Sequence, residues 1–198
     1  MFNEKMEIEL HRKQPPSRSK RKKELYKLLV ARSDITASLN SCKQILEKVD
    51  GLGHELYYPL YTAVVICYTR PFTNNKPHGA LPKKWYTFDD EILSETHNDL
   101  ISARNELIAH SDMTIKEAYV VPAGCEIGKD GDKPLVSDFI GVQTTMHYFP
   151  RPMFEKICNL CMFQGTRINQ EIDDLITELY EGMELPSKPF KIRIDNGL

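Results

Sequence analysis

The residues from Arg104 to Asp112, which read RNELIAHSD, concentrate more potential chemistry than any other segment of this 198-residue chain. They place an arginine, an amide, two carboxylates and a histidine within about two and a half turns of a helix. A helical pattern precedes them from Asp89, and the character of the sequence changes after Asp112. The segment is therefore expected to close a long helix, where polar side chains reach solvent and a ligand while the earlier turns stay buried.

Arg104 and His110 together offer the two functions that cleavage of RNA needs. Arginine stays protonated and presents a planar fork that suits phosphate oxygens. Histidine exchanges a proton near neutral pH, so it can activate a ribose 2′-hydroxyl as a general base. The guanidinium then stabilises the negative charge that develops around phosphorus. This chemistry requires no metal ion and no cofactor, and we expect neither, because the sequence lacks a local cluster of metal ligands.

On one ideal helix, however, Arg104 and His110 point about 120° apart, because their positions differ by six residues. They converge only if the helix bends or ends near Ala109, or if a second copy of the helix supplies the partner group. Asn105 would orient the substrate or its partner side chain. His97 lies seven residues before Arg104, on nearly the same face, and could join the site, although a partly buried structural histidine is the simpler interpretation.

Hydrophobic periodicity predicts that helices position this segment. Four helical stretches are expected, and the segment lies at the end of the third. An antiparallel bundle is the natural packing for four such helices, so the predicted fold class is all-α. The expected ranges of the helices are about 18–50, 54–68, 89–109 and 153–181.

A segment at about 117–148 departs from the helical pattern. Its stretches 118–121 and 139–148 are rich in β-branched and aromatic residues, and several glycines lie between them. This pattern predicts one small β-hairpin inserted into a helical domain that spans 18–183. Polar, proline-containing sequence predicts a flexible leader over 1–17 and a tail over 184–198.

Composition sets broad limits on the class of protein. Apolar residues at 41% and charged residues at 27% are ordinary for a soluble globular domain. A net charge of −2 excludes a strongly cationic protein that coats nucleic acid, but it does not exclude a local anion site. No stretch resembles a signal peptide or is long and apolar enough to span a membrane, so a cytoplasmic protein without a membrane partner is expected.

The five cysteines are odd in number and spread over helical segments, which favours reduced thiols over a disulfide framework. Cys158 and Cys161 form a CxxC motif, but no second such motif and no histidine pair at ligand spacing accompany it. Both cysteines also match the apolar stripe of their helix. A buried structural role is therefore predicted for them.

The pattern RN-x-x-x-AH-x-D, carried here by Arg104, Asn105, His110 and Asp112, resembles the HEPN superfamily (higher eukaryotes and prokaryotes nucleotide-binding). The superfamily pattern is an arginine, four to six further residues and a histidine; this chain has five. Within the superfamily, the chain is most similar to proteins of the abortive-infection type. The end of the second predicted helix, YTRPF, is also similar, which makes Arg70 a candidate binding residue.

The resemblance implies an all-α bundle that forms a homodimer, with the motif helices meeting at the interface. It implies metal-independent ribonuclease activity of the toxin or phage-defence type, with RNA or a nucleotide as ligand and an antitoxin protein as a further partner. A composite site across the dimer would also bring together the two side chains that one helix separates. The catalytic candidates are Arg104, His110 and Asn105, and the binding candidates are Asp112, His97 and Arg70.

Two other functions are compatible with the same residues. Many proteins of that superfamily bind RNA, nucleotides or proteins without cleaving RNA, so a non-catalytic HEPN module is the main alternative. A purely structural dimerising bundle is the third, in which Arg104 pairs with an acidic neighbour, Glu106 pairs with His110 one turn on, and Asp112 caps a loop. The fold alone does not decide among them.

Overall fold

The computed structural model describes residues 17–51, 53–74, 79–109, 118–130, 133–144, 149–185 and 187–188. Helices account for most of these residues, and the predicted all-α class with four helices is confirmed in that sense. The elements are α1 (Arg18–Lys48), α2 (Tyr57–Thr69), η1 (Arg70–Phe72), η2 (Lys83–Tyr86), α3 (Glu91–Ala109), β1 (Ala118–Val121), β2 (Glu126–Asp130), β3 (Lys133–Val136), β4 (Gly141–Thr144) and α4 (Arg151–Tyr180).

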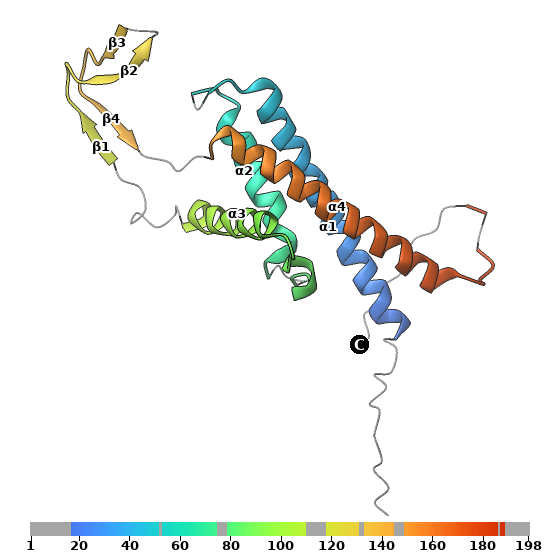
Figure 1. Ribbon diagram of the computed structural model, residues 1–198. Coiled ribbons are helices and arrows are strands. Elements are labelled where there is room, and N and C mark those ends of the chain that lie inside the picture. The colour runs from blue at the N-terminus through green and yellow to red at the C-terminus, as the bar shows by residue number, and fades with distance from the viewer. Residues whose placement is uncertain are drawn as a thin grey trace, which may run out of the picture.

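α1 and α4 are the two longest helices and form an antiparallel pair (Figure 1). The thiol of Cys42, near the end of α1, donates to the carbonyl oxygen of Phe154 near the start of α4, at 2.9 Å. At the other end of the pair, Arg21 Nε donates to Glu178 at 3.0 Å. Each helix buries a stripe of residues spaced three or four apart, which is the pattern that packing along another helix requires. Among the described helices, none is both long and apolar enough to cross a membrane.

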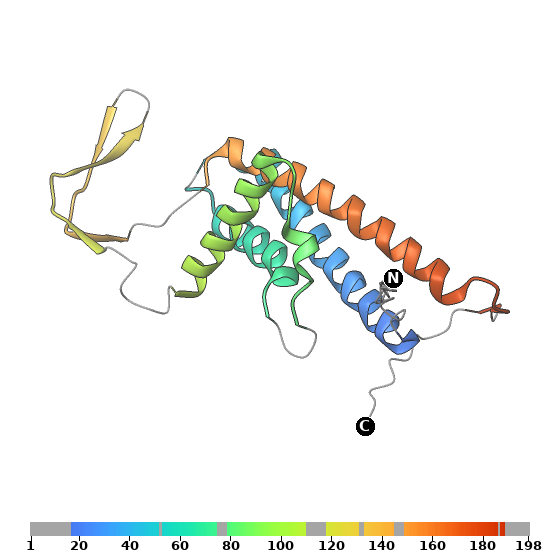
Figure 2. The same cartoon turned by 60° about the horizontal axis from the view of Figure 1, so that its bottom comes forward.

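α2 packs against α1, and α3 packs against both α2 and α4. Ser38 of α1 donates its hydroxyl to the carbonyl oxygen of Val64 at 2.9 Å, whereas Arg70, just beyond α2, pairs with Asp34 one turn earlier in α1. α2 therefore runs antiparallel to α1. α3 runs across α2, and its carboxyl end lies on the side of the helices where the strands are (Figures 1 and 2).

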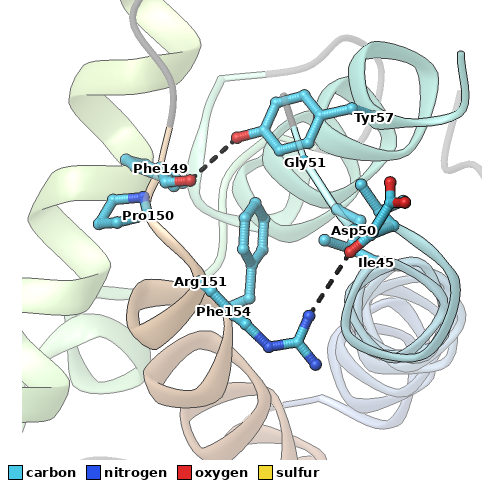
Figure 3. A pocket seen from close by; sticks show the side chains of 9 residues that line it. Ile45, Asp50, Gly51, Tyr57, Phe149, Pro150, Arg151 and Phe154 are labelled. Atoms are coloured by element: carbon cyan, nitrogen blue, oxygen red, sulfur yellow. Dashed lines mark hydrogen bonds between the residues drawn. The ribbon is translucent and has the colours of Figure 1, made fainter. Parts of the chain in front are cut away.

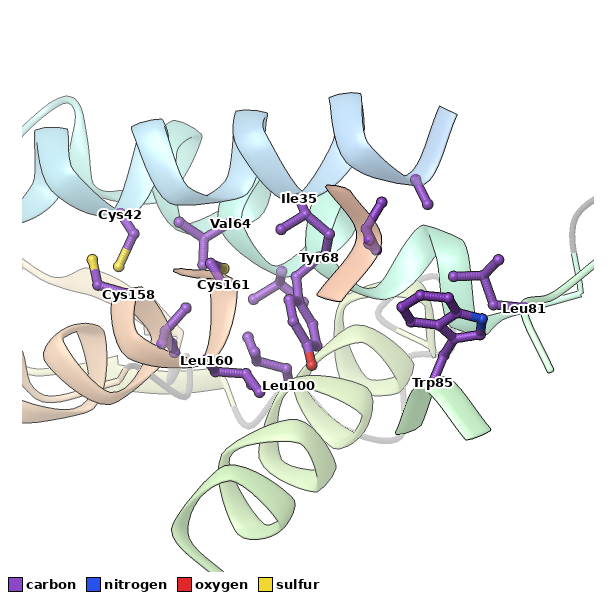
Figure 4. Close-up of a cluster of buried hydrophobic side chains, with 14 of the residues drawn as sticks. Ile35, Cys42, Val64, Tyr68, Leu81, Trp85, Leu100, Cys158, Leu160 and Cys161 are labelled. Carbon is purple, nitrogen blue, oxygen red and sulfur yellow. The ribbon is translucent and has the colours of Figure 1, made fainter. Parts of the chain in front are cut away.

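The core fills the space between these helices (Figure 4). Tyr68 of α2 is fully buried, and its hydroxyl points toward α3. The segment just before α3 also contributes to the core, because it forms η2 and buries Trp85. The buried amide of Gln164 donates to the carbonyl oxygen of Trp85 at 2.6 Å and so fixes η2 on α4.

Local residues account for the start of α3 and the end of α2. Asp90 caps α3, since its carboxylate accepts a hydrogen bond from the backbone N–H of Leu93 at 3.0 Å. α2 ends at Thr69, close to the predicted end at about residue 68. Arg70 keeps helical backbone angles (φ −55°, ψ −44°), and the chain turns through η1 before it leaves at Thr73. Proline is tolerated in the first turn of η1 because the N–H that it lacks has no intrahelical partner there.

The strands form two antiparallel pairs, β1 with β4 and β2 with β3. The first pair joins Ala118 to Thr144 and agrees with the predicted pairing of 118–121 with 139–148. The stretch between them was expected to be a turn, but it holds the second pair. We call residues 118–130 and 133–144 the arm, which extends away from the helices (Figures 1 and 2).

Candidate functional site

Arg104 and Asn105 lie near the carboxyl end of α3. Arg104 is half-buried and Asn105 is exposed. Arg104 Nη1 lies 3.5 Å from Asn105 Oδ1, which is a long hydrogen bond at the surface. Within the described part of the chain, no carboxylate lies within ion-pair distance of this guanidinium. Among the described groups, its charge is therefore not neutralised.

The packing of α3 explains why these two neighbours differ in exposure. Leu100 and Ala103 are buried against the rest of the core. Successive residues of a helix point about 100° apart, so Arg104 lies at the border of the buried face and Asn105 lies on the face turned to solvent. α3 is described as far as Ala109, where the third helix was predicted to end.

The other half of the predicted site lies outside the described residues. His110 and Asp112 follow α3 directly in the sequence, and the structure does not describe them. The predicted meeting of Arg104 with His110 therefore stays a prediction.

His97 lies in the core, where it is 6% exposed and surrounded by aromatic rings. Tyr86 stacks on its ring with an interplanar angle of 4°, while Phe72 and Phe88 approach it at steeper angles. The Nδ1 atom lies 2.9 Å from the hydroxyl of Tyr68. Burial lowers the pKa of His97 to about 4, so the ring is neutral at pH 7. This geometry supports the simpler interpretation of a structural histidine over the candidate binding role.

Arg70 packs η1 against α1. Its Nη1 atom donates to Oδ1 of Asp34 at 2.7 Å, and the side chains of Arg70 and Asp34 are 49% and 11% exposed. Burial raises the pKa of Asp34, and the adjacent guanidinium opposes that rise. The other carboxylate oxygen, Oδ2, is buried and has no hydrogen-bond partner among the described groups. Arg70 is thus the counter-charge of a buried carboxylate, whatever else its exposed part contacts.

The start of α1 carries a run of basic residues between Arg18 and Lys23, and two of them contact α4. Arg18 donates to the carbonyl oxygen of Leu179 at 3.1 Å, in the last turn of α4. Arg21 pairs with Glu178 at 3.0 Å. Positive charge is favourable at the carboxyl end of a helix, where unpaired carbonyls gather. These two arginines therefore stabilise the far end of the α1–α4 pair.

The CxxC cysteines are buried, as predicted. Cys158 and Cys161 lie on the face of α4 that meets α1, and the sulfur of Cys158 points toward that of Cys42 (Figure 4). Burial raises the pKa of Cys161 to about 12 and that of Cys42 further still. The described residues include no group of three or more histidine, cysteine, aspartate or glutamate side chains that could hold a metal ion.

A pocket at the foot of the arm was not predicted. It has a volume of about 230 Å³ and lies where the end of α1, the start of α2 and the start of α4 meet (Figure 3). Tyr57, Phe149 and Phe154 line its wall, and the hydroxyl of Tyr57 donates to the carbonyl oxygen of Phe149 at 3.0 Å. Arg151 and Asp50 lie at its mouth. Its residues come from three separate segments, so no local motif could have marked it.

Of the six candidate residues, four are described, and only two of these touch one another. Arg104 contacts Asn105, whereas His97 contacts Tyr68 and Arg70 contacts Asp34. The surface at the end of α3 can bind an anion through a guanidinium and an amide, whereas His110, the group expected to transfer a proton, lies outside the described residues. Comparison with protein families, curated proteins and solved structures found no match to this chain.

Proposed function

We propose that this protein is a metal-independent endoribonuclease of the HEPN type, which acts as a toxin or in phage defence. The observation that carries the proposal is the position of Arg104 and Asn105, which are adjacent, in contact and accessible near the end of α3. The sequence that follows completes the RN-x-x-x-AH-x-D pattern with His110 and Asp112. An arginine whose charge no described carboxylate neutralises is suited to a phosphate oxygen.

The proposed reaction is an internal transfer of the phosphoryl group. His110 takes the proton of a ribose 2′-hydroxyl, and the 2′-oxygen attacks the adjacent phosphorus. The bond from phosphorus to the 5′-oxygen of the next nucleotide breaks, and that oxygen receives a proton. The products are a 2′,3′-cyclic phosphate and a free 5′-hydroxyl. Arg104 binds the non-bridging oxygens as their charge increases, and Asn105 orients the phosphate.

A second copy of the chain completes the site in this proposal. On a straight helix Arg104 and His110 diverge by about 120°. Ser102 and Asn105 are exposed near the carboxyl end of α3. A two-fold axis beside this end of the helix would bring Arg104 of one subunit close to His110 of the partner subunit.

The test is incubation of purified protein with end-labelled tRNA and mRNA in the presence of EDTA. Wild type should cleave both RNAs and leave 2′,3′-cyclic phosphate ends. His110→Ala should slow cleavage by about 10²–10⁴-fold, as is usual for loss of a general acid–base group. Arg104→Lys should also be slow, because an ammonium keeps the charge but not the planar fork. Asn98→Ala, which changes an exposed amide two turns before Asn105 on α3, is the matched control and should cleave at the rate of wild type.

The outcomes separate the proposal from its alternatives. Cleavage by His110→Ala at the wild-type rate, with an unchanged circular dichroism spectrum, would show that His110 does not take the proton of the 2′-hydroxyl. If no variant and no wild-type preparation cleaves RNA, but Arg104→Ala weakens RNA binding, the protein is a non-catalytic binding module. If neither cleavage nor binding is measurable, the helices have only a structural role.

A further inference from the structure

The bend of the arm combines an ordered backbone with exposed apolar side chains. We call residues 122–126 and 136–141 the elbow. Two backbone hydrogen bonds join its two segments. Gly124 N–H donates to the Ser137 carbonyl at 2.8 Å, and Ser137 N–H donates to the Cys125 carbonyl at 2.9 Å. The hydroxyl of Ser137 also donates to the carbonyl oxygen of Phe139 at 2.6 Å. From this corner Phe139 and Ile140 extend into solvent, each 74% exposed.

No described part of the chain covers these two side chains. Figures 1 and 2 place the arm well away from the helices. Its strands form two pairs of only two strands each, and an isolated two-stranded pair is marginally stable in water. Adjacent, fully exposed large apolar side chains on an ordered corner mark a contact surface. The arm is therefore expected to dock on another surface.

The pocket at the foot of the arm has the matching properties. Its walls are apolar, with Ile45, Tyr57 and Phe154 among them. At about 230 Å³ it is smaller than the roughly 300–1,000 Å³ of sites for drug-sized ligands, and it suits a single large side chain. At its mouth, the guanidinium of Arg151 is held by the carbonyl oxygens of Leu46 and Val49, at the end of α1 (Figure 3).

We propose that the elbow of each chain docks in the pocket of a second copy, so that two chains exchange arms. Phe139 enters the apolar pocket, and Asp138, the exposed residue before it, meets Arg151 at the mouth. This pairing matches the apolar side chain to the apolar wall and the anion to the cation. Asp50 also lies at the mouth, so the docked elbow must approach from the Arg151 side.

Symmetry makes the exchange reciprocal. The pocket lies at the foot of the arm, because Phe149 and Arg151 follow the end of β4 by only a few residues. The elbow lies at the other end of the β1–β4 pair. A two-fold axis through the middle of that pair therefore places each elbow at the foot of the other copy's arm. Both contacts then form together and are identical, as in an isologous dimer. Within one chain, the bend of the arm lies away from the start of α4, which forms part of the pocket (Figures 1 and 2).

The oligomeric state measured by sedimentation equilibrium over a range of concentrations is the first test. Wild type should be dimeric. Phe139→Ser should weaken each contact about tenfold, and since the dimer holds two contacts, its Kd should rise about a hundredfold. The matched control is Ile92→Ser, which changes an exposed apolar residue on the open face of α3 and should leave the Kd unchanged. A monomer at every concentration, or a dimer lost with Ile92→Ser and kept with Phe139→Ser, would overturn the proposal.

Charge variants test the orientation of the docked elbow. Asp138→Asn and Arg151→Gln should each raise the dimer Kd, whereas Asp50→Asn should leave it unchanged or lower it. The double reversal Asp138→Arg with Arg151→Asp should recover part of the association that either single reversal loses. Because Arg151 also holds α1 carbonyls, melting curves must show that its variants stay folded at the temperature of the measurement. A Kd that responds to Asp50 and not to Asp138 contradicts the orientation.

Cross-linking distinguishes exchange between copies from docking within one chain. Two variants, Ile140→Cys and Asp50→Cys, are made in a Cys125→Ser background, which removes the exposed native thiol of the elbow. When the two are mixed with a short bis-maleimide, a product with the mass of two chains is expected. A chain that carries both substitutions and cross-links only within itself would show that the elbow occupies its own pocket. Absence of any cross-link at concentrations above the measured Kd would also overturn the proposal.

Discussion

The hydroxyl of Tyr68 and the Nδ1 atom of His97 lie 2.9 Å apart in the core and form a hydrogen bond that joins α2 to α3. Burial raises the pKa of Tyr68 well above its usual value and lowers the pKa of His97 to about 4. Both side chains are therefore neutral at pH 7. A neutral imidazole has one N–H and one bare nitrogen, so the tautomer of His97 decides which of the two atoms donates.

Tyr68→Phe removes the hydroxyl and leaves Nδ1 of His97 buried without this partner. We expect the free energy of unfolding to fall by about 1–3 kcal/mol, measured by urea denaturation. The double variant Tyr68→Phe/His97→Leu removes both polar groups and should cost less than the sum of the two single changes. Strictly additive costs would contradict a coupling between these side chains.

Stability should depend on pH through His97. The pKa of His97 in the folded protein, about 4, lies below the usual histidine pKa of 6.5, so the unfolded chain binds a proton between these pH values and the folded chain does not. The contribution of the neutral ring is therefore complete above pH 6.5 and is lost as the pH falls toward 4. Urea midpoints between pH 4.5 and 7.5 should fall more steeply for wild type than for Tyr68→Phe/His97→Leu. Parallel curves would mean that His97 does not titrate in this window.

Removing Arg70 should lower the free energy of unfolding more than neutralising Asp34, because Asp34 is the buried member of this ion pair. Arg70→Gln leaves a buried carboxylate without its counter-charge and should destabilise the protein by about 1–3 kcal/mol, less than for a fully buried pair because Arg70 is half exposed. Asp34→Asn removes the buried charge itself and should cost less. Lowering the pH protonates Asp34, whose pKa is raised, so the cost of Arg70→Gln should shrink in acid. Equal costs at all pH values would contradict this.

The exposed thiol should react with a labelling reagent before the buried thiols. Cys125 is exposed in the elbow, whereas Cys42, Cys158 and Cys161 are buried, with the pKa of Cys42 and of Cys161 raised. A thiol reacts as its thiolate, so the buried cysteines should be modified only after unfolding. Brief labelling with a maleimide followed by peptide mass mapping should find Cys125 modified first. Labelling of Cys158 at the rate of Cys125 would show that α4 opens readily.

Local sequence signals predicted the helices well because the spacing of apolar residues within one helix indicates which of its faces is buried. The extent of α1 and the buried positions of Cys158 and Cys161 both follow from spacing along one helix. The same holds for the strand 118–121 and its partner, since their β-branched and aromatic residues distinguish them from the helices.

Features that join distant segments could not be predicted in this way. The carboxylate of Asp34 meets Arg70 across 36 positions, and the ring of His97 is enclosed by residues from α2, η1 and η2. The apolar pocket likewise depends on how three helix ends meet. The sequence identified Arg104 and Asn105 by residue type, and the packing of α3 accounts for their different exposure.

The pairing of α1 with α4 also affects how the chain is made. Arg21 and Glu178 are 157 positions apart, so a ribosome that adds roughly 5–20 residues per second needs roughly 8–30 seconds to supply the partner of α1 after its first turns emerge. During that time α2 covers part of the apolar stripe, and the rest stays exposed to other nascent chains. A ribosome that stops before α4 releases a protein with much of α1 uncovered, and such chains aggregate or need a chaperone.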